Sequence, residues 1–174
     1  MSLSYDLQML DEGIARVREI FPELPGDAAL CRVMLLVSQR MHEQLEAKLK
    51  PFKLNDSEFR TLMMLFSKPD GGFTPGELCV FTSQGATNMT RIADALVKRG
   101  LITRMPSAED RRRVLIKITA AGKRFVRKML PEMFPSLVLI FAGFSDTDRR
   151  NLMRLLRKLA VNLCQLENEA GDPP

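Results

Sequence analysis

Apolar residues recur at helical spacing over most of the chain. They stand three or four positions apart along Leu30–Leu49 and again along Leu152–Leu166, which predicts two long amphipathic helices. Asp27 is expected to cap the first of these. A shorter stretch of the same kind, Leu7–Phe21, predicts an N-terminal helix that ends at Pro22. The pattern therefore predicts a mainly α protein with long helices towards both ends.

Polar residues that cap helices mark where the shorter helices begin. Asn55 and Thr74 each precede a glutamate by three positions, which is the capping-box spacing that opens a helix. Thr82 or Ser83 is expected to cap the next helix, and Gly100 is expected to end it in the left-handed conformation. The apolar positions expected on the inner face of that helix are Met89, Ile92, Ala93, Leu96 and Val97.

The period then changes from helical to alternating. Leu101–Met105 and Val114–Ile118 predict two strands joined by a polar tip, which is a β-hairpin. Two further helices follow, and Pro131 and Pro135 are expected to kink or interrupt the first of them because each removes a backbone donor. A short helix, a turn, a second helix and a hairpin, in that order, predict a winged helix-turn-helix between about Phe73 and Gly122.

The distribution of charge sharpens this picture. The formal net charge is +5, but Gly85–Leu130 contains twelve Lys and Arg against three Asp and Glu, a local charge of +9. The rest of the chain carries −4. A basic segment of this kind is typical of a protein with a polyanionic partner, although a solvated basic surface explains the charge alone equally well.

Residue usage argues against several other classes of protein. The three cysteines, Cys31, Cys79 and Cys164, are few and widely spaced, and suggest neither disulfides nor a zinc site. His42 is the only histidine, and no nucleophile–base pair or phosphate-binding glycine loop is visible. We therefore expect no enzyme, metal or other cofactor. No stretch approaches a membrane span and no secretory signal is visible, so we expect a cytoplasmic protein without a membrane partner.

The helix that ends at Gly100 has outward side chains suited to reading double-stranded DNA. Asn and Gln can bond adenine bidentately, Arg can bond guanine, and Thr can contact a thymine methyl group. Arginines at the hairpin tip suit phosphates or a narrow minor groove. Asp110 is expected to pair with a nearby arginine within the hairpin. The residues expected to bind DNA are Ser83, Gln84, Thr87, Asn88, Thr90, Arg91, Lys98, Arg104, Arg111, Arg112 and Arg113.

An ordinary surface helix and a solubilising loop are the alternative interpretations of these two elements. Six consecutive residues without a charge, Thr82–Thr87, are unusual at the start of a solvated helix. This feature favours contact with DNA.

Two segments resemble a known family. The chain reads Ala-Thr-Asn-Met-Thr-Arg-Ile-Ala-Asp-Ala-Leu-Val-Lys-Arg-Gly from Ala86 and Glu-Asp-Arg-Arg-Arg-Val-Leu-Ile-Lys-Ile-Thr-Ala-Ala-Gly from Glu109. Both segments resemble the MarR family, whose most specific signature is the Asp-Arg-Arg wing followed by a strand and Thr-x-x-Gly. The first segment is similar to the EmrR/MprA branch, which regulates multidrug-efflux operons. The resemblance covers roughly Leu30–Leu166 and is strongest over Phe73–Gly122.

The resemblance implies a homodimeric transcriptional repressor that binds a pseudo-palindromic operator, with the outer helices forming the dimer. It implies the following division of the chain: an N-terminal extension (1–26), a helical dimerisation region (27–54 and 123–168), a winged helix-turn-helix lobe (55–122) and a flexible tail (169–174).

Many members of this family are released from DNA by small lipophilic anions or phenols. The resemblance places the walls of such a pocket at Val37, Met41, Met63 and Phe66. Some members sense oxidants through a cysteine in the helix that holds Cys31. The peroxide-sensing branch has tyrosines beside that cysteine, whereas the only tyrosine here is Tyr5. We therefore expect Cys31 to be a buried, inert thiol. Two alternative functions stay open: a redox-sensing regulator that uses Cys31, and a constitutive nucleic-acid-binding module without a sensor.

Overall fold

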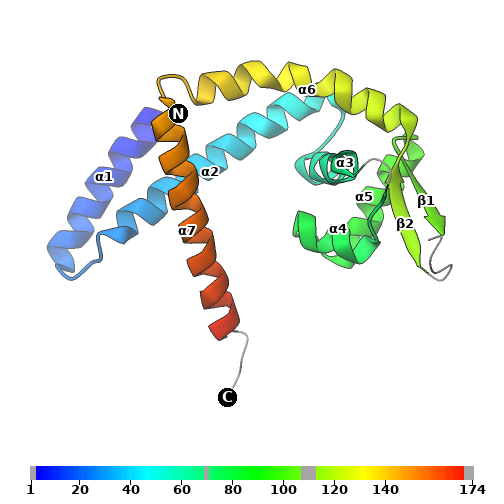
Figure 1. Cartoon of the computed structure of the whole chain (residues 1–174). Helices are drawn as coiled ribbons and strands as arrows, with labels where there is room; N and C mark the ends of the chain where they lie inside the picture. The colour runs from blue at the N-terminus through cyan, green and yellow to red at the C-terminus, as the bar shows by residue number, and fades with distance from the viewer. Residues whose placement is uncertain (1–2, 69–70, 107–112, 171–174) are drawn as a thin grey trace. The chain divides into compact units, whose positions relative to one another are not determined.

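The computed structural model describes residues 3–68, 71–106 and 113–170. It is mainly helical with one antiparallel hairpin, which confirms the expected fold class (Figure 1). The chain forms two compact units, Met1–Leu130 and Pro131–Pro174. The elements in order are α1 (Leu3–Ile20), α2 (Asp27–Leu49), the 3₁₀ turn η1 (Lys50–Phe52), α3 (Asp56–Ser67), α4 (Pro75–Thr82), α5 (Ala86–Lys98), β1 (Ile102–Pro106), β2 (Val114–Ile118), α6 (Ala120–Ile140) and α7 (Asp146–Ala170).

Three helices and the hairpin gather into one lobe of the first unit (Figure 1). α5 packs against α3, α4 and β1, and β2 packs against α3. Phe73, which precedes α4, extends the sheet through two backbone bonds with Ile116 (3.1 and 2.8 Å). This arrangement is the predicted winged helix-turn-helix. The side chains buried in its core include Leu62, Leu65, Leu78, Met89, Ile92, Leu96, Ile102, Ile116 and Ile118.

Both predicted capping boxes are present. The side chain of Asn55 accepts a bond from the backbone N–H of Glu58 (2.8 Å), and Glu58 accepts one from the N–H of Asn55 in return (3.1 Å). At the start of α4, the N–H and the hydroxyl of Thr74 both donate to Glu77 Oε2 (2.6 and 2.8 Å). These two bonds hold the pKa of Glu77 below its ordinary value, and the backbone bond contributes most.

Two other predicted caps are wrong. Ser83 has a left-handed backbone (φ 53°) and ends α4, while Gly85 begins α5 without any side-chain cap. Thr82 is buried and its hydroxyl bonds the Leu78 carbonyl within α4 (2.6 Å), so it caps nothing. Asp27 is the first residue inside α2, after Gly26. A serine between two helices can end the first or cap the start of the second. The tight turn between α4 and α5 gives Ser83 a left-handed backbone, so it ends α4.

The inner face of α5 is narrower than expected. Four of its five predicted positions are buried, but Val97 is 38% exposed because it lies at the edge of the apolar stripe. Gly100 has the expected left-handed backbone (φ 68°). The chain then turns at once into β1, where the Leu101 N–H bonds the Leu96 carbonyl (3.0 Å).

The start of α6 lies tightly against the base of the hairpin. The hydroxyl of Thr119 donates to the Gly100 carbonyl (2.7 Å), and its oxygen accepts a bond from the Gly122 N–H (2.9 Å). A Cβ at position 122 would stand 2.1 Å from the Leu101 carbonyl oxygen. The Thr-x-x-Gly sequence is therefore a packing requirement: threonine joins the two elements, and only glycine fits the contact.

The prolines of α6 do not end it. The helix continues from Ala120 to Ile140 through Pro131 and Pro135, so of the two expected effects the interruption is wrong, while the kink stays a prediction. Each proline removes one backbone donor, and the bonds of the neighbouring residues still hold the helix. The boundary between the two compact units nevertheless falls at Pro131.

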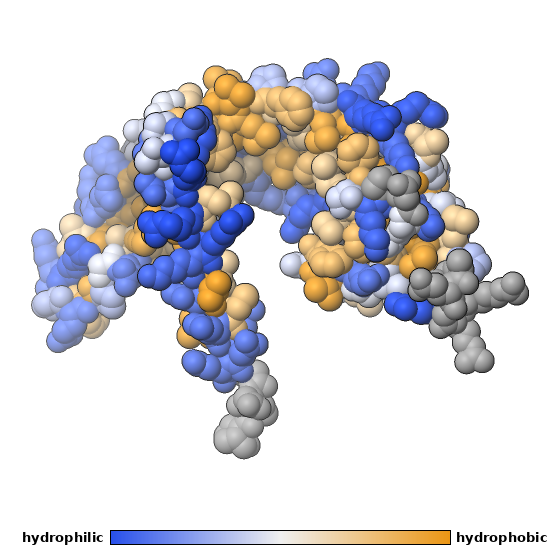
Figure 2. Space-filling view, in the orientation of Figure 1, coloured by the Kyte–Doolittle hydropathy of each residue, from blue (hydrophilic) through white to orange (hydrophobic). Residues whose placement is uncertain are grey.

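The outer helices expose much apolar surface. α1, from the predicted N-terminal extension, packs on α2, where Arg40 pairs with Asp6. Ser145 immediately precedes α7, and its hydroxyl donates to Asp148 in the first turn (2.6 Å). Apolar atoms stand among charged ones along α7 (Figure 2), and its exposed apolar residues are Met153, Leu155, Leu156, Val161, Leu163 and Leu166. Within the described ranges, no helix is apolar enough over sufficient length to span a membrane.

We predict that Gly122→Ala destabilises the protein by about 1–3 kcal/mol, because the added methyl group overlaps the Leu101 carbonyl oxygen. Gly76→Ala in α4 is the matched control, since a Cβ there meets nothing within 4 Å. Alanine at position 76 should leave stability unchanged or raise it by up to about 1 kcal/mol. Urea denaturation measures both variants, and equal midpoints for Gly122→Ala and the wild type would contradict the close contact.

We also predict that part of the acid sensitivity comes from the α4 cap. Because the folded pKa of Glu77 is depressed, its contribution to stability is fully present above the ordinary pKa and is lost as the pH falls through the folded pKa. Glu77→Gln should therefore show a smaller loss of unfolding free energy between neutral and acidic pH than the wild type. Glu19→Gln, at an exposed position on α1, should keep the wild-type loss. Equal pH profiles for Glu77→Gln and wild type would show that the carboxylate does not act in this way.

Candidate nucleic-acid interface

One face of α5 is turned outwards along its whole length. Its buried residues occupy the opposite side, against α3 and α4. Thr87, Arg91 and Lys98, all predicted to bind DNA, are exposed on the outward face. Neither Arg91 nor Lys98 has a carboxylate partner among the described residues, so both cations are open to an incoming anion.

The other predicted residues near the start of α5 are partly engaged. The Asn88 side chain donates to Gln84, which in turn donates to the Thr82 carbonyl (3.3 Å), and both amides are half-buried. The Thr90 hydroxyl bonds the Ala86 carbonyl within the helix (3.0 Å). Ser83 is exposed in the turn before α5. The linked amides of Gln84 and Asn88 form a pre-arranged polar pair beside the exposed Thr87.

The start of α5 differs electrostatically from the starts of α3 and α4. Those two helices have a glutamate closing a capping box, whereas α5 has no side-chain cap and no acidic residue in its first turn. Its first N–H groups therefore lack side-chain acceptors, and the helix dipole there favours an anion. Helix starts of this kind bind phosphate groups.

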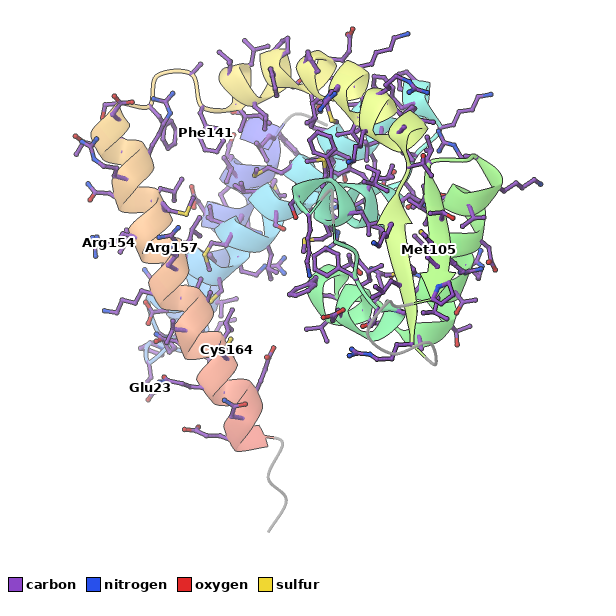
Figure 3. The ribbon with its side chains drawn as sticks, turned by 45° about the vertical axis from the view of Figure 1, so that its right-hand side comes forward. Glu23, Met105, Phe141, Arg154, Arg157 and Cys164 are labelled. Atoms are coloured by element: carbon purple, nitrogen blue, oxygen red, sulfur yellow. The ribbon has the colours of Figure 1, made fainter. Side chains whose placement is uncertain are left out.

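The hairpin adds cationic groups next to α5. Arg113 is exposed just before β2. The hairpin can be found in Figure 3 by the label of Met105, which belongs to β1. Arg104, also predicted to bind DNA, pairs with Asp94 of α5 (Nη1–Oδ1 2.6 Å). The predicted contacts of Arg111 and Arg112 and the predicted internal pairing of Asp110 fall outside the described residues.

Two residues that the sequence patterns did not single out shape this site. Arg99 donates to the carbonyls of Lys53 and Phe52 (2.8 and 2.9 Å) and lies 5.3 Å above the Phe125 ring. It therefore ties the end of α5 to the turn after α2 and to α6. Asp94 is the other, through Arg104. Their partners lie 10 to 47 positions away in sequence, so no local motif marks them.

The residues predicted to line an effector pocket all lie in the first unit. Val37 and Met41 are exposed on α2, and Met63 and Phe66 are half-buried on α3. None of the four lines the apolar groove between α1 and α2, whose lining includes Tyr5, Met9, Ile14, Val17, Leu35 and Leu36.

The cysteine and histidine of α2 are both at the surface. Cys31 is exposed, so the expectation of a buried thiol is wrong. The apolar stripe of α2 is itself largely uncovered in the single chain, which leaves the neighbouring positions open too. His42 is exposed, with Nδ1 3.9 Å from Asp56 Oδ2.

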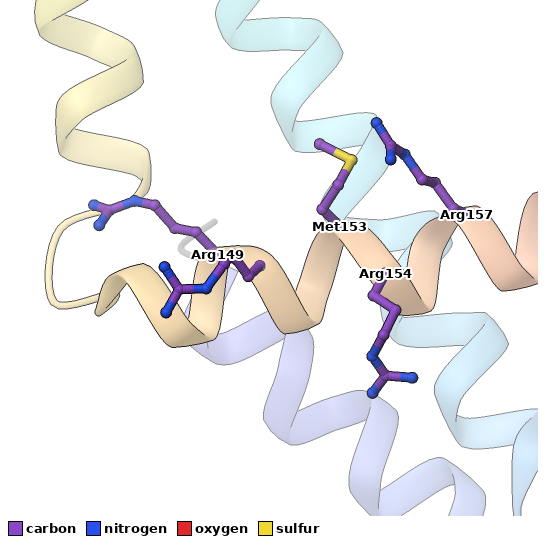
Figure 4. Close-up of a pocket in the computed structure, with 5 residues that line it drawn as sticks. Arg149, Met153, Arg154 and Arg157 are labelled. Atoms are coloured by element: carbon purple, nitrogen blue, oxygen red, sulfur yellow. The ribbon is translucent and has the colours of Figure 1, made fainter.

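A second group of arginines lies on α7, around a shallow hollow that also includes Met153. Arg149 bonds the Phe141 carbonyl (3.0 Å), and Arg150 bonds Thr147 (3.1 Å). Arg154 and Arg157 point in different directions (Figure 4). Because these side chains do not converge, they make a basic surface and not a site for one anion.

Comparisons with known proteins agree with this geometry. The profile of a family described as "MarR family" matches residues 52–113. The chain is 33% identical over 140 residues to "Transcriptional repressor MprA" from Escherichia coli, covering 80% of each chain. It is 26% identical over 138 residues to "HTH-type transcriptional repressor YetL" from Bacillus subtilis, covering 79% of this chain and 83% of that one.

Solved structures show the same fold. A cysteine-to-serine mutant of MarR from E. coli, complexed with operator DNA, matches with a TM-score of 0.67 and 26% identity over 82% of this chain and 96% of that one. The complex of S. aureus MepR with DNA also has a TM-score of 0.67, at 19% identity over 75% of this chain and 94% of that one. From the sequence identity to the E. coli repressor and the length covered, the chain belongs to the MarR family, whose members are transcriptional regulators and not enzymes.

Proposed function

We propose that this protein is a homodimeric transcriptional repressor that binds a pseudo-palindromic operator through α5 and the hairpin, and that a small lipophilic compound releases it. The observation that carries the proposal is the outward face of α5. It begins at an uncapped helix start and exposes Thr87, Arg91 and Lys98 within the most basic segment of the chain.

The side chains of this face divide into two roles. Thr87 and Arg91, with the Gln84–Asn88 pair, belong to the first half of the helix, which enters the major groove in helix-turn-helix proteins. They would contact base edges and so determine sequence preference. Lys98 and the arginines predicted at the hairpin tip, Arg111, Arg112 and Arg113, would contact phosphates, which adds affinity without sequence information.

A second copy is the partner that the outer helices require. α2 and α7 expose apolar side chains that a stable protein in water normally covers, among them Leu35 of α2 and Leu163 of α7. In a two-fold dimer, both copies present α5 to one duplex, with half-sites about one helical turn apart. The related MarR structure bound to operator DNA supports this mode of binding.

The proposed role of the effector draws on a further relative. The chain is 32% identical over 93 residues to "Multiple antibiotic resistance protein MarR" from Salmonella typhimurium, covering 53% of this chain and 63% of that one. That name supports a role in antibiotic resistance, and we propose that the role is control of multidrug efflux. Val37, Met41, Met63 and Phe66 would contact the compound. Release would follow if the compound binds more tightly to a dimer whose two α5 helices are wrongly spaced for DNA.

We predict that Arg91→Ala weakens binding to the operator by about 1–3 kcal/mol, because it removes a base contact, and weakens binding to an unrelated duplex much less. Arg16→Ala on α1 is the matched control: it removes the same charge from an exposed arginine outside both the DNA-binding lobe and the proposed dimerisation region, and it should bind like the wild type. Fluorescence anisotropy with labelled duplexes measures all three proteins. If Arg91→Ala bound the operator as tightly as the wild type, the role given to α5 would be wrong.

A further inference from the structure

The outward face of α5 contains one acidic residue among its cations. Asp94 lies three positions after Arg91 and four before Lys98, and all three side chains are exposed. A carboxylate on a face that approaches DNA is repelled by the phosphates. The presence of Asp94 at the centre of this face therefore needs a physical reason.

Asp94 bonds an arginine of the hairpin and not the cations of its own helix. Residues three and four positions apart on a helix are neighbours and often form ion pairs. Asp94 nevertheless bonds Arg104 of β1, with 2.6 Å between Oδ1 and Nη1, and forms no ion pair with Arg91 or Lys98. The acid thus neutralises the hairpin cation and leaves the two helix cations available.

Stabilisation of the fold does not explain this pair. The side chains of Arg104 and Asp94 are 39% and 59% exposed, and an ion pair so exposed contributes at most about 1 kcal/mol. β1 is already fixed by backbone contacts, since Arg104 pairs with Ile116 in the hairpin and Leu101 is bonded to Leu96. The main effect of the pair is on the surface charge of the lobe, because Asp94 neutralises Arg104.

We propose that Asp94 limits the sequence-independent affinity for DNA, because it holds Arg104 in a neutral pair and so prevents it from binding any phosphate within reach. This proposal rests on the proposed function, in that α5 faces DNA. An unpaired Arg104 adds a phosphate contact that is the same on every sequence. Binding to any duplex, including one without an operator, is then tighter and depends more steeply on salt.

The test uses the full chain and a duplex without any operator sequence, over a range of salt concentrations. Asp94→Asn should steepen the dependence of log Kd on log salt by about 0.9, the change for one added phosphate contact. With this added slope, lowering the salt from 1 M to 0.1 M tightens the binding of Asp94→Asn by about eightfold more than it tightens the binding of the wild type. Asp11→Asn, an equal charge change at an exposed position of α1, should leave the slope unchanged.

A second pair of variants tests whether the effect passes through Arg104. Adding Asp94→Asn to Arg104→Gln should change the slope much less than Asp94→Asn changes it in the wild type. Equal steepening in that background would mean that Asp94 simply repels DNA, and it would overturn the proposal, as would an unchanged slope for Asp94→Asn alone. These slopes are measured on non-specific DNA, so they stand apart from operator preference, which tests the proposed function separately.

Discussion

The close approach of the first turn of α6 to the carbonyl of Leu101 is the contact on which the DNA-binding lobe depends. It needs glycine at position 122, because a Cβ would stand 2.1 Å from that oxygen. Thr119 completes the junction through its bond to Gly100. This junction joins the end of α5 to the base of the hairpin. Arg99 ties the same end of α5 to the turn after α2. α5 and the hairpin therefore present their side chains as one surface.

That surface is defined by the groups that the fold leaves unsatisfied. α3 and α4 close their first turns with glutamates, so their N-termini are satisfied within the chain. α5 begins without a side-chain cap, and it keeps Arg91 and Lys98 without a carboxylate partner among the described residues. The acid on the same face pairs with the hairpin instead. The distribution of pairs thus concentrates available positive charge and free donors on α5, the helix that we propose contacts DNA.

The features that sequence patterns predicted are local ones. The capping boxes at Asn55 and Thr74, the left-handed glycine at position 100 and the hairpin all follow from residues within a few positions of one another. Two kinds of feature escaped these patterns: a choice between two adjacent helix ends, and contacts beyond that range. Ser83 could have capped α5, but the tight turn gives it a left-handed backbone. Arg99 and Asp94 depend on partners that only the folded chain brings close, and the exposure of Cys31 depends on what covers α2.

The central claim is that α5 reads DNA sequence as one half of a two-fold dimer. Selection of bound duplexes from a random pool, with the full chain at about 0.15 M salt, tests it most directly, because non-specific charge attraction is weakened there. The account predicts a recurring inverted repeat with half-site centres about one helical turn apart. A selected pool with no inverted repeat would contradict it.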